Sequence, residues 1–172
     1  MKKISLFGDW APGERIATIL VKADFPIINI EGPVIVDAPG MLIPAQKAGP
    51  ALFNSSFPMF ESGGIAVLAN NHLFDFGRWG YEATKGAIRK KDWLAVGAGS
   101  SKKEACDAIF FDWNGKRVAV VARCETQFGI AQETKPGVAA LDMTIFEQIR
   151  QLKKEVDFVI ASIHAAAEML PW

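Results

Sequence analysis

The chain has 172 residues, of which 50% are hydrophobic and 22% charged, and its nineteen acidic and nineteen basic side chains cancel at neutral pH. This composition excludes a disordered chain and predicts one globular domain over residues 1–172. The balanced charge gives no general attraction to nucleic acid, and no apolar run approaches the ~20 residues of a membrane span. Two cysteines are too few for a disulfide framework, and residues 4–7 are too short an apolar run for an export signal, so we expect a cytoplasmic protein.

The chain alternates between two kinds of apolar pattern. Short apolar runs between turn signals are typical of buried strands, and they occur at residues 3–7, 25–30, 65–69, 93–96 and 157–163. Helical spacing and helix-favouring residues predict helices at residues 14–22, 78–91 and 141–155, with shorter helical pieces at 57–62 and 101–106. Asn114-Gly115 separates two further apolar runs, 108–113 and 117–122, and predicts an antiparallel hairpin because a tight two-residue turn needs positive φ.

The remaining segments are expected to be turns and loops. Gly8-Asp9 should end the first strand, and residues 97–99 should end the fourth. Several prolines and glycines predict a long surface loop at residues 34–56, with a short extended piece near 34–36, and residues 126–138 are polar and irregular. The sequence therefore predicts an α/β fold of mostly parallel buried strands with one antiparallel hairpin.

Polar side chains follow four of the predicted strands. They are Asp9, Glu31, Asn71, His72 and His164, and they include both histidines of the chain. The carboxyl ends of parallel strands meet at one edge of an open α/β sheet, although they are far apart in sequence. We therefore expect these side chains to share one site.

The side chains at these strand ends suit a divalent cation. Carboxylates, an amide oxygen and a neutral imidazole are ligands for Mn²⁺, Mg²⁺, Zn²⁺ or Fe²⁺. Two such ions can clamp a phosphoryl group and lower the pKa of a bound water until it becomes the nucleophile. A histidine outside the metal-binding set could then protonate the leaving oxygen.

Each residue also has a purely structural interpretation. Asp9 is a typical helix N-cap, and Asn29 and Glu31 could be ordinary solvated strand ends. Asn70 and Asn71 are common turn formers, and His72 could be a hydrogen-bonded core imidazole. The coincidence of four apolar strands that all end in metal-competent groups favours the shared site.

The ordered motifs of the chain resemble those of the CapA family, which is named for capsule and poly-γ-glutamate synthesis and is similar in fold to the calcineurin-like metallophosphoesterases. The matching motifs are Gly8-Asp9, Asn29-Ile30-Glu31-Gly32-Pro33, Leu68-Ala69-Asn70-Asn71-His72 with Asp75 and Gly77, Gly97-Ala98-Gly99, Pro136-Gly137-Val138, and Ser162-Ile163-His164 with Glu168. The two longest motifs are specific in that order, whereas Gly-Asp alone is not.

The resemblance implies an α/β sandwich with a dinuclear centre of Mn²⁺, Zn²⁺, Fe²⁺ or Mg²⁺ at the strand ends. It implies metal ligands at Asp9, Glu31, Asn71 and His164. It also implies that His72 is a proton donor oriented by Asp75. The residues that would support these groups or face the substrate are Asn29, Asn70 and Glu168.

The function implied is a metal-dependent hydrolase of phosphoesterase type that acts on a phosphate ester or polymer-biosynthesis substrate for capsule, poly-γ-glutamate or exopolysaccharide synthesis. Family members usually continue with Trp-Gly after the last histidine and later carry a Gly-His-His-Pro-His segment, whereas this chain has Ala165-Ala166 and ends at Trp172. The usual C-terminal portion is thus expected to be missing, so that a homo-oligomer or a C-terminal continuation would complete the domain. The alternative is a non-catalytic accessory or binding module with an incomplete metal site.

Overall fold

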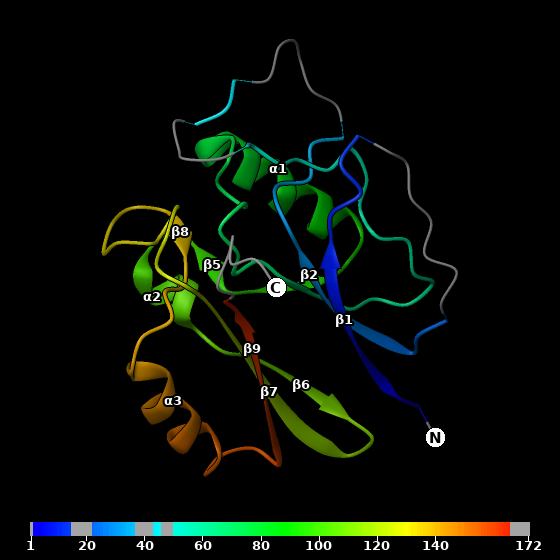
Figure 1. Ribbon diagram of the computed structural model, residues 1–172. Coiled ribbons are helices and arrows are strands. Elements are labelled where there is room, and N and C mark those ends of the chain that lie inside the picture. The colour runs from blue at the N-terminus through cyan, green and yellow to red at the C-terminus, as the bar shows by residue number, and fades with distance from the viewer. Residues whose placement is uncertain (1, 15–21, 37–42, 46–49, 166–172) are drawn as a thin grey trace, which may run out of the picture.

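The computed structural model describes residues 2–14, 22–36, 43–45 and 50–165 (Figure 1). Of the helix predicted at 14–22, only the end residues Glu14 and Lys22 are described, so this prediction lies outside the described residues. The candidate residue Glu168 also lies outside them. Most of the loop expected at 34–56 is described, and its described part contains neither a helix nor a named strand. Within it, Val34 forms an isolated parallel bridge with Asn54, which agrees with the extended piece expected there.

The first sheet contains four parallel strands in the order β1-β2-β3-β4. Their bounds are β1 Ile4–Trp10, β2 Phe25–Ile30, β3 Ile65–Val67 and β4 Leu94–Val96. Nearly every residue of β2 and all of β3 are buried, as expected for apolar runs without polar alternation. The prediction of parallel strands is confirmed, whereas the predicted burial holds only for β2 and β3: Trp10 is the only buried residue of β1, and Val96 the only one of β4.

The second sheet contains three strands in the order β6-β7-β9. Their bounds are β6 Ile109–Trp113, β7 Lys116–Cys124 and β9 Phe158–His164. The first two form the predicted antiparallel hairpin, and its turn residues Asn114 and Gly115 have φ values of 50° and 77°. β7 and β9 run parallel, so that their carboxyl ends lie side by side, and their last residues, Cys124 and His164, are register partners.

The two sheets share one hydrophobic core, and helices pack around them (Figure 1). Alternate residues of β7 divide between two clusters: Val120 and Ala122 join the main core with β2 and β3, whereas Ala119 and Val121 face α3 (Thr144–Leu152). Helix α1 (Gly77–Lys90) contributes to the main core. The fold is therefore an α/β sandwich of the metallophosphoesterase-like kind, as predicted.

Two expectations about the strand ends are wrong. β1 does not stop at Gly8-Asp9 but continues to Trp10, because a register shift between Phe7 and Asp9 allows pairing with β2 to resume. Asp9 is thus a strand residue and not a helix N-cap. Asn29 is also not a solvated strand end, since only 7% of it is exposed.

The shorter elements also differ in part from expectation. Residues 57–62 form no helical turn, and the Phe57 ring packs edge-on against Trp93 at 5.1 Å between ring centroids. Two segments expected to be turn and loop contain short strands that pair with each other, β5 Ala98–Gly99 and β8 Gly137–Val138. The short helix α2 (Lys102–Cys106) is confirmed, and its first turn is capped by the Ser101 hydroxyl, which accepts a hydrogen bond from the Glu104 amide.

Candidate functional site

The carboxyl ends of strands from both sheets meet at one polar cluster. Asp9 and Asn29 are register neighbours on β1 and β2, whereas His164 is the last residue of β9 in the other sheet. Asn71 lies in the turn after β3. The sandwich therefore brings together side chains that are far apart along the chain: Asn29 and His164, for example, are separated by 135 residues.

His164 is the centre of this cluster. Its Nδ1 atom lies 3.3 Å from Asn29 Nδ2 and 3.9 Å from Asp9 Oδ1, and its Nε2 atom lies 3.2 Å from Asn71 Oδ1. Asn29 Nδ2 also donates a hydrogen bond of 2.6 Å to Asp9 Oδ1. Both ring nitrogens therefore lie within hydrogen-bond distance of an amide side chain, and which nitrogen donates depends on the tautomer of the ring. A neutral imidazole is the form that binds metal ions.

Asn70 joins the end of β2 to the turn that carries the next two site residues. Its amide nitrogen donates to the Ile30 carbonyl at 2.8 Å and to Asn29 Oδ1 at 3.2 Å. Its amide oxygen accepts from the backbone N–H groups of Gly32 and His72, each at 3.2 Å. Asn70 is only 1% exposed, so it is a structural connector and not simply a turn former.

His72 and Asp75 form a pair beside the polar cluster. His72 Nδ1 lies 2.7 Å from Asp75 Oδ2, which also accepts a hydrogen bond of 2.6 Å from the Leu52 amide. The Asp75 side chain is fully buried, while 20% of the His72 side chain is exposed. His72 is thus not a buried core imidazole. The Asp75 carboxylate fixes the orientation of the ring through Nδ1.

Glu31 follows β2 and interacts with the carboxyl group of Asp9. Burial raises the pKa of Glu31, and the nearby Asp9 charge and a hydrogen bond between the two side chains raise it further. His164 and His72 lower the pKa of the Glu31 carboxyl group. Two carboxyl groups in contact repel one another when both are ionised, so they form a place where a bound cation would be favourable.

The raised pKa of Glu31 predicts a pH-dependent effect on stability. A carboxyl group whose pKa is higher in the folded state stabilises the fold fully at acid pH, and that contribution is lost as the pH rises through the folded pKa. Glu31→Gln removes this loss. The melting temperature of the variant minus that of the original protein should therefore increase as the pH rises from about 4 to about 7. Thermal unfolding without divalent ions, followed by circular dichroism, measures this difference.

Glu147→Gln on α3 is the matched control for this prediction. The pKa of Glu147 is lowered by hydrogen bonds from Gln151 and Arg150. Its contribution is present at neutral pH and lost as the pH falls below about 5, so the relative melting temperature of this variant should decrease from about pH 3 to about pH 5. Equal slopes for the two variants would contradict the assignment of a raised pKa to Glu31.

A cavity of about 450 Å³ adjoins the polar cluster, and sequence reasoning did not find it. Gln127, one of its lining residues, accepts a hydrogen bond of 3.2 Å from the amide of Asn71. The cationic side chains of Arg78 and Lys135 also line it. Gln127 and Lys135 belong to the segment expected to be irregular, where no local pattern indicates which side chains turn toward a distant site.

The donor set of the polar cluster fits a metal ion only if amide oxygen takes part. Among the described residues, no group of three His, Cys, Asp or Glu side chains is arranged to hold a metal ion. The 3.2 Å between Asn71 Oδ1 and His164 Nε2 nevertheless matches the roughly 3.0–3.4 Å that separates adjacent ligands each ~2.1 Å from one ion. With the Asp9 and Glu31 carboxylates beside them, these donors suit a hard or borderline divalent cation.

The structure thus places eight of the nine candidate residues in one region, and Glu168 lies outside its described part. An α/β sandwich with polar side chains gathered at the carboxyl ends of its strands is the architecture of metallophosphoesterase-like proteins. Residues 7–171 match the family model described as bacterial capsule synthesis protein PGA_cap. The chain belongs to this family, as its motifs predicted.

Two curated relatives from Bacillus agree with this assignment. The chain is 26% identical over 167 residues to the capsule biosynthesis protein CapA of Bacillus anthracis, a match that covers 90% of this chain and 40% of that protein. It is 33% identical over 104 residues to the PGA biosynthesis protein CapA of Bacillus subtilis (strain 168), covering 58% of this chain and 27% of that protein. The chain therefore spans less than half the length of these relatives. None of the helices in the described part of the chain is long and apolar enough to cross a membrane.

Proposed function

We propose that this chain is a metal-dependent hydrolase of phosphoesterase type that serves capsule, poly-γ-glutamate or exopolysaccharide biosynthesis. The observation that carries the proposal is the contact of His164 with both Asn71 and Asn29 at the Asp9 carboxylate, because it joins the strand ends of two sheets in one donor set. Membership of the capsule synthesis family supports the biological setting.

Four side chains would hold the metal in this proposal: Asp9, Glu31, Asn71 and His164. One or two ions of Mn²⁺, Zn²⁺, Fe²⁺ or Mg²⁺ would supply a Lewis acid and a water of lowered pKa. Asn29 holds the Asp9 carboxylate and the His164 ring in place through its amide nitrogen. Asn70 positions Asn29 in turn, through the hydrogen bond to its Oδ1 atom.

His72 would act as the general acid. Asp75 accepts a hydrogen bond from Nδ1 and stabilises the protonated ring, so that Nε2 can donate its proton to the leaving oxygen of the substrate. The His72 side chain is 20% exposed, which supports access of a substrate to the ring. The role resembles that of an oriented histidine in other hydrolases, in which a buried carboxylate holds the ring.

The adjoining cavity supports an anionic substrate. Arg78 and Lys135 place positive charge along its wall, and the Gln127 side chain lies between this cavity and Asn71. A phosphate ester or a carboxylate-rich polymer would gain from these cations, although exposed charges contribute modestly in water. The substrate class that fits is therefore a phosphate ester or an anionic intermediate of polymer synthesis.

A non-catalytic accessory or binding module is the second candidate. It is favoured by the absence, among the described residues, of a compact cluster of three His, Cys, Asp or Glu side chains. The chain also spans only 40% and 27% of the two curated relatives, whose whole activity need not reside in the matched part.

Metal analysis combined with turnover separates the two candidates. We expect protein purified without chelator to carry about one to two divalent ions per chain and to hydrolyse p-nitrophenyl phosphate or its diester when Mn²⁺, Zn²⁺, Fe²⁺ or Mg²⁺ is added. Chelation should abolish turnover, and one of these ions should restore it. Absence of both bound metal and turnover at millimolar metal would favour the accessory module.

A further inference from the structure

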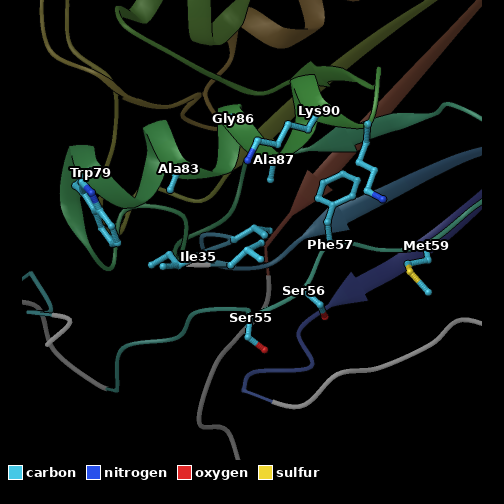
Figure 2. A pocket seen from close by; sticks show the side chains of 13 residues that line it. Ile35, Ser55, Ser56, Phe57, Met59, Trp79, Ala83, Gly86, Ala87 and Lys90 are labelled. Carbon is cyan, nitrogen blue, oxygen red and sulfur yellow. The ribbon is translucent and has the colours of Figure 1, made fainter. Parts of the chain in front are cut away.

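A second cavity, outside the polar cluster, lies along α1. It has a volume of about 570 Å³ and separates α1 from the segments around Val34 and Phe57 (Figure 2). Pockets that bind small molecules are typically about 300–1,000 Å³ and mostly apolar. We call this cavity the α1 groove, and none of the candidate metal ligands or the His72–Asp75 pair lines it.

One helical face of α1 forms the floor of the α1 groove. The lining residues on this face are spaced as helical neighbours, and they are Trp79, Ala83, Gly86, Ala87 and Lys90. Small side chains occupy the middle of this face (Figure 2). A Cβ atom added at Gly86 would meet no atom within 4 Å, so the space above this glycine is open.

The opposite wall is also apolar. Ile35 and Phe57 face the helix across the groove, and Met59 lies near its far end (Figure 2). Several of the large apolar side chains in the walls are exposed to solvent, with exposed fractions of 44% for Trp79, 58% for Val36 and 55% for Met59. A contiguous exposed apolar surface of this kind on a folded domain indicates a binding function.

Positive charge is concentrated at one end of the groove. Lys90 and Lys91 line it at the C-terminal end of α1, and neither forms an ion pair with another described residue. The floor from Trp79 to Lys90 is about 16 Å long at the rise of an α-helix. The groove thus combines an apolar channel with a cationic end. A second copy of the chain bound there would have to cover the two lysines, whereas an anionic ligand would pair with them.

We propose that the α1 groove binds a single-chain anionic amphiphile. The apolar chain would lie along Ala83, Gly86 and Ala87, and the anionic head group would lie at Lys90 and Lys91. The charge of the head is complementary to the lysines, and the length of the floor suits one extended alkyl or prenyl chain. This site is independent of the proposed hydrolysis, because it uses none of the same side chains.

Binding of dodecyl phosphate, titrated below its critical micelle concentration, tests this proposal on the full chain. Trp79 lines the groove, so its fluorescence should shift to shorter wavelength on binding, and calorimetry should give a saturable isotherm. Dodecyl maltoside and dodecyltrimethylammonium have the same alkyl chain but lack the anionic head group. Their affinity should be lower than that of dodecyl phosphate by a factor of about ten or more. Inorganic phosphate alone should not compete. Equal binding of all three amphiphiles would overturn the proposal.

Gly86 supplies a pair of variants that distinguishes the groove from other surfaces. Gly86→Trp should fill the space above the helix and abolish binding of dodecyl phosphate. Gly86→Ala should retain binding, because its side chain is small. The two variants are matched, because both remove a glycine from a helix interior. Circular dichroism checks that both variants fold. Unchanged binding in Gly86→Trp would place the amphiphile elsewhere and contradict the proposal.

Two further measurements complete the test. Replacement of both lysines, as Lys90→Gln with Lys91→Gln, should weaken dodecyl phosphate about tenfold and leave dodecyl maltoside unaffected. Trp79→Phe should remove the fluorescence shift but keep the calorimetric signal. A concentration-dependent dimer that Gly86→Trp disrupts, without binding of any amphiphile, would assign the groove to a second copy and overturn the proposal.

Discussion

His72→Asn is expected to lower turnover of a phosphate ester by about 10²–10⁴-fold, the usual contribution of a general acid, while the metal content stays unchanged. The Asp75 contact at 2.7 Å fixes the ring for proton transfer. The measurements are kcat on p-nitrophenyl phosphate, elemental analysis of the variant and its melting temperature.

His164→Asn is the matched comparison, because it changes the other histidine in the same way. This variant should lose both turnover and bound metal, since its ring contacts Asn71 and Asn29 and lies close to Asp9. His72→Asn should lose turnover alone. Unaltered kcat in His72→Asn would remove it as proton donor, and loss of metal from both variants to the same extent would show that the two histidines act as one ligand set.

Asn70→Ala should lower the free energy of unfolding by about 2–4 kcal/mol, the largest stability effect that we expect from a single substitution in the site. Asn70 donates to Ile30 and Asn29 and accepts from Gly32 and His72, so the truncation leaves buried partners unpaired. The loss comes from desolvated polar groups and not from lost apolar packing. Urea unfolding at fixed pH measures it.

The controls for Asn70→Ala separate its two groups of hydrogen bonds. Asn70→Asp keeps the acceptor and loses both donors, so it should also be destabilising. Gln127→Ala removes an exposed amide with one hydrogen bond to Asn71 and should change the free energy of unfolding by less than about 0.5 kcal/mol. Similar values for Asn70→Ala and Gln127→Ala would contradict the connector role of Asn70.

Local chemistry made several elements predictable. The hairpin follows from Asn114-Gly115, because both residues adopt the positive φ that the tight turn requires. The predicted helix at 78–91 agrees closely with α1 (Gly77–Lys90), where helix-favouring residues run without a proline. Parallel pairing of the early strands follows from apolar runs that leave no polar face. In each case the information lies within a few neighbouring residues.

The errors arose where distant residues decide the local conformation. β1 passes through Gly8 and Asp9 because β2 offers a register that accommodates the shift, which local turn propensity does not reveal. β5 and β8 are two-residue strands that exist only because they pair with each other. Residues 57–62 form no helical turn, and Phe57 packs on Trp93, a residue far along the chain.

By itself, the sequence determined the types of the main elements and the identity of the polar residues that end the strands, because both are encoded by short-range patterns of hydrophobicity and turn chemistry. Only the tertiary structure decided how the two sheets pack and therefore which atoms meet: His164 reaches Asn71 across 93 residues and Asn29 across 135. The adjoining cavity and the α1 groove likewise depend on the packing of segments far apart in the chain. Such contacts depend on long-range packing, which no local pattern of residues specifies.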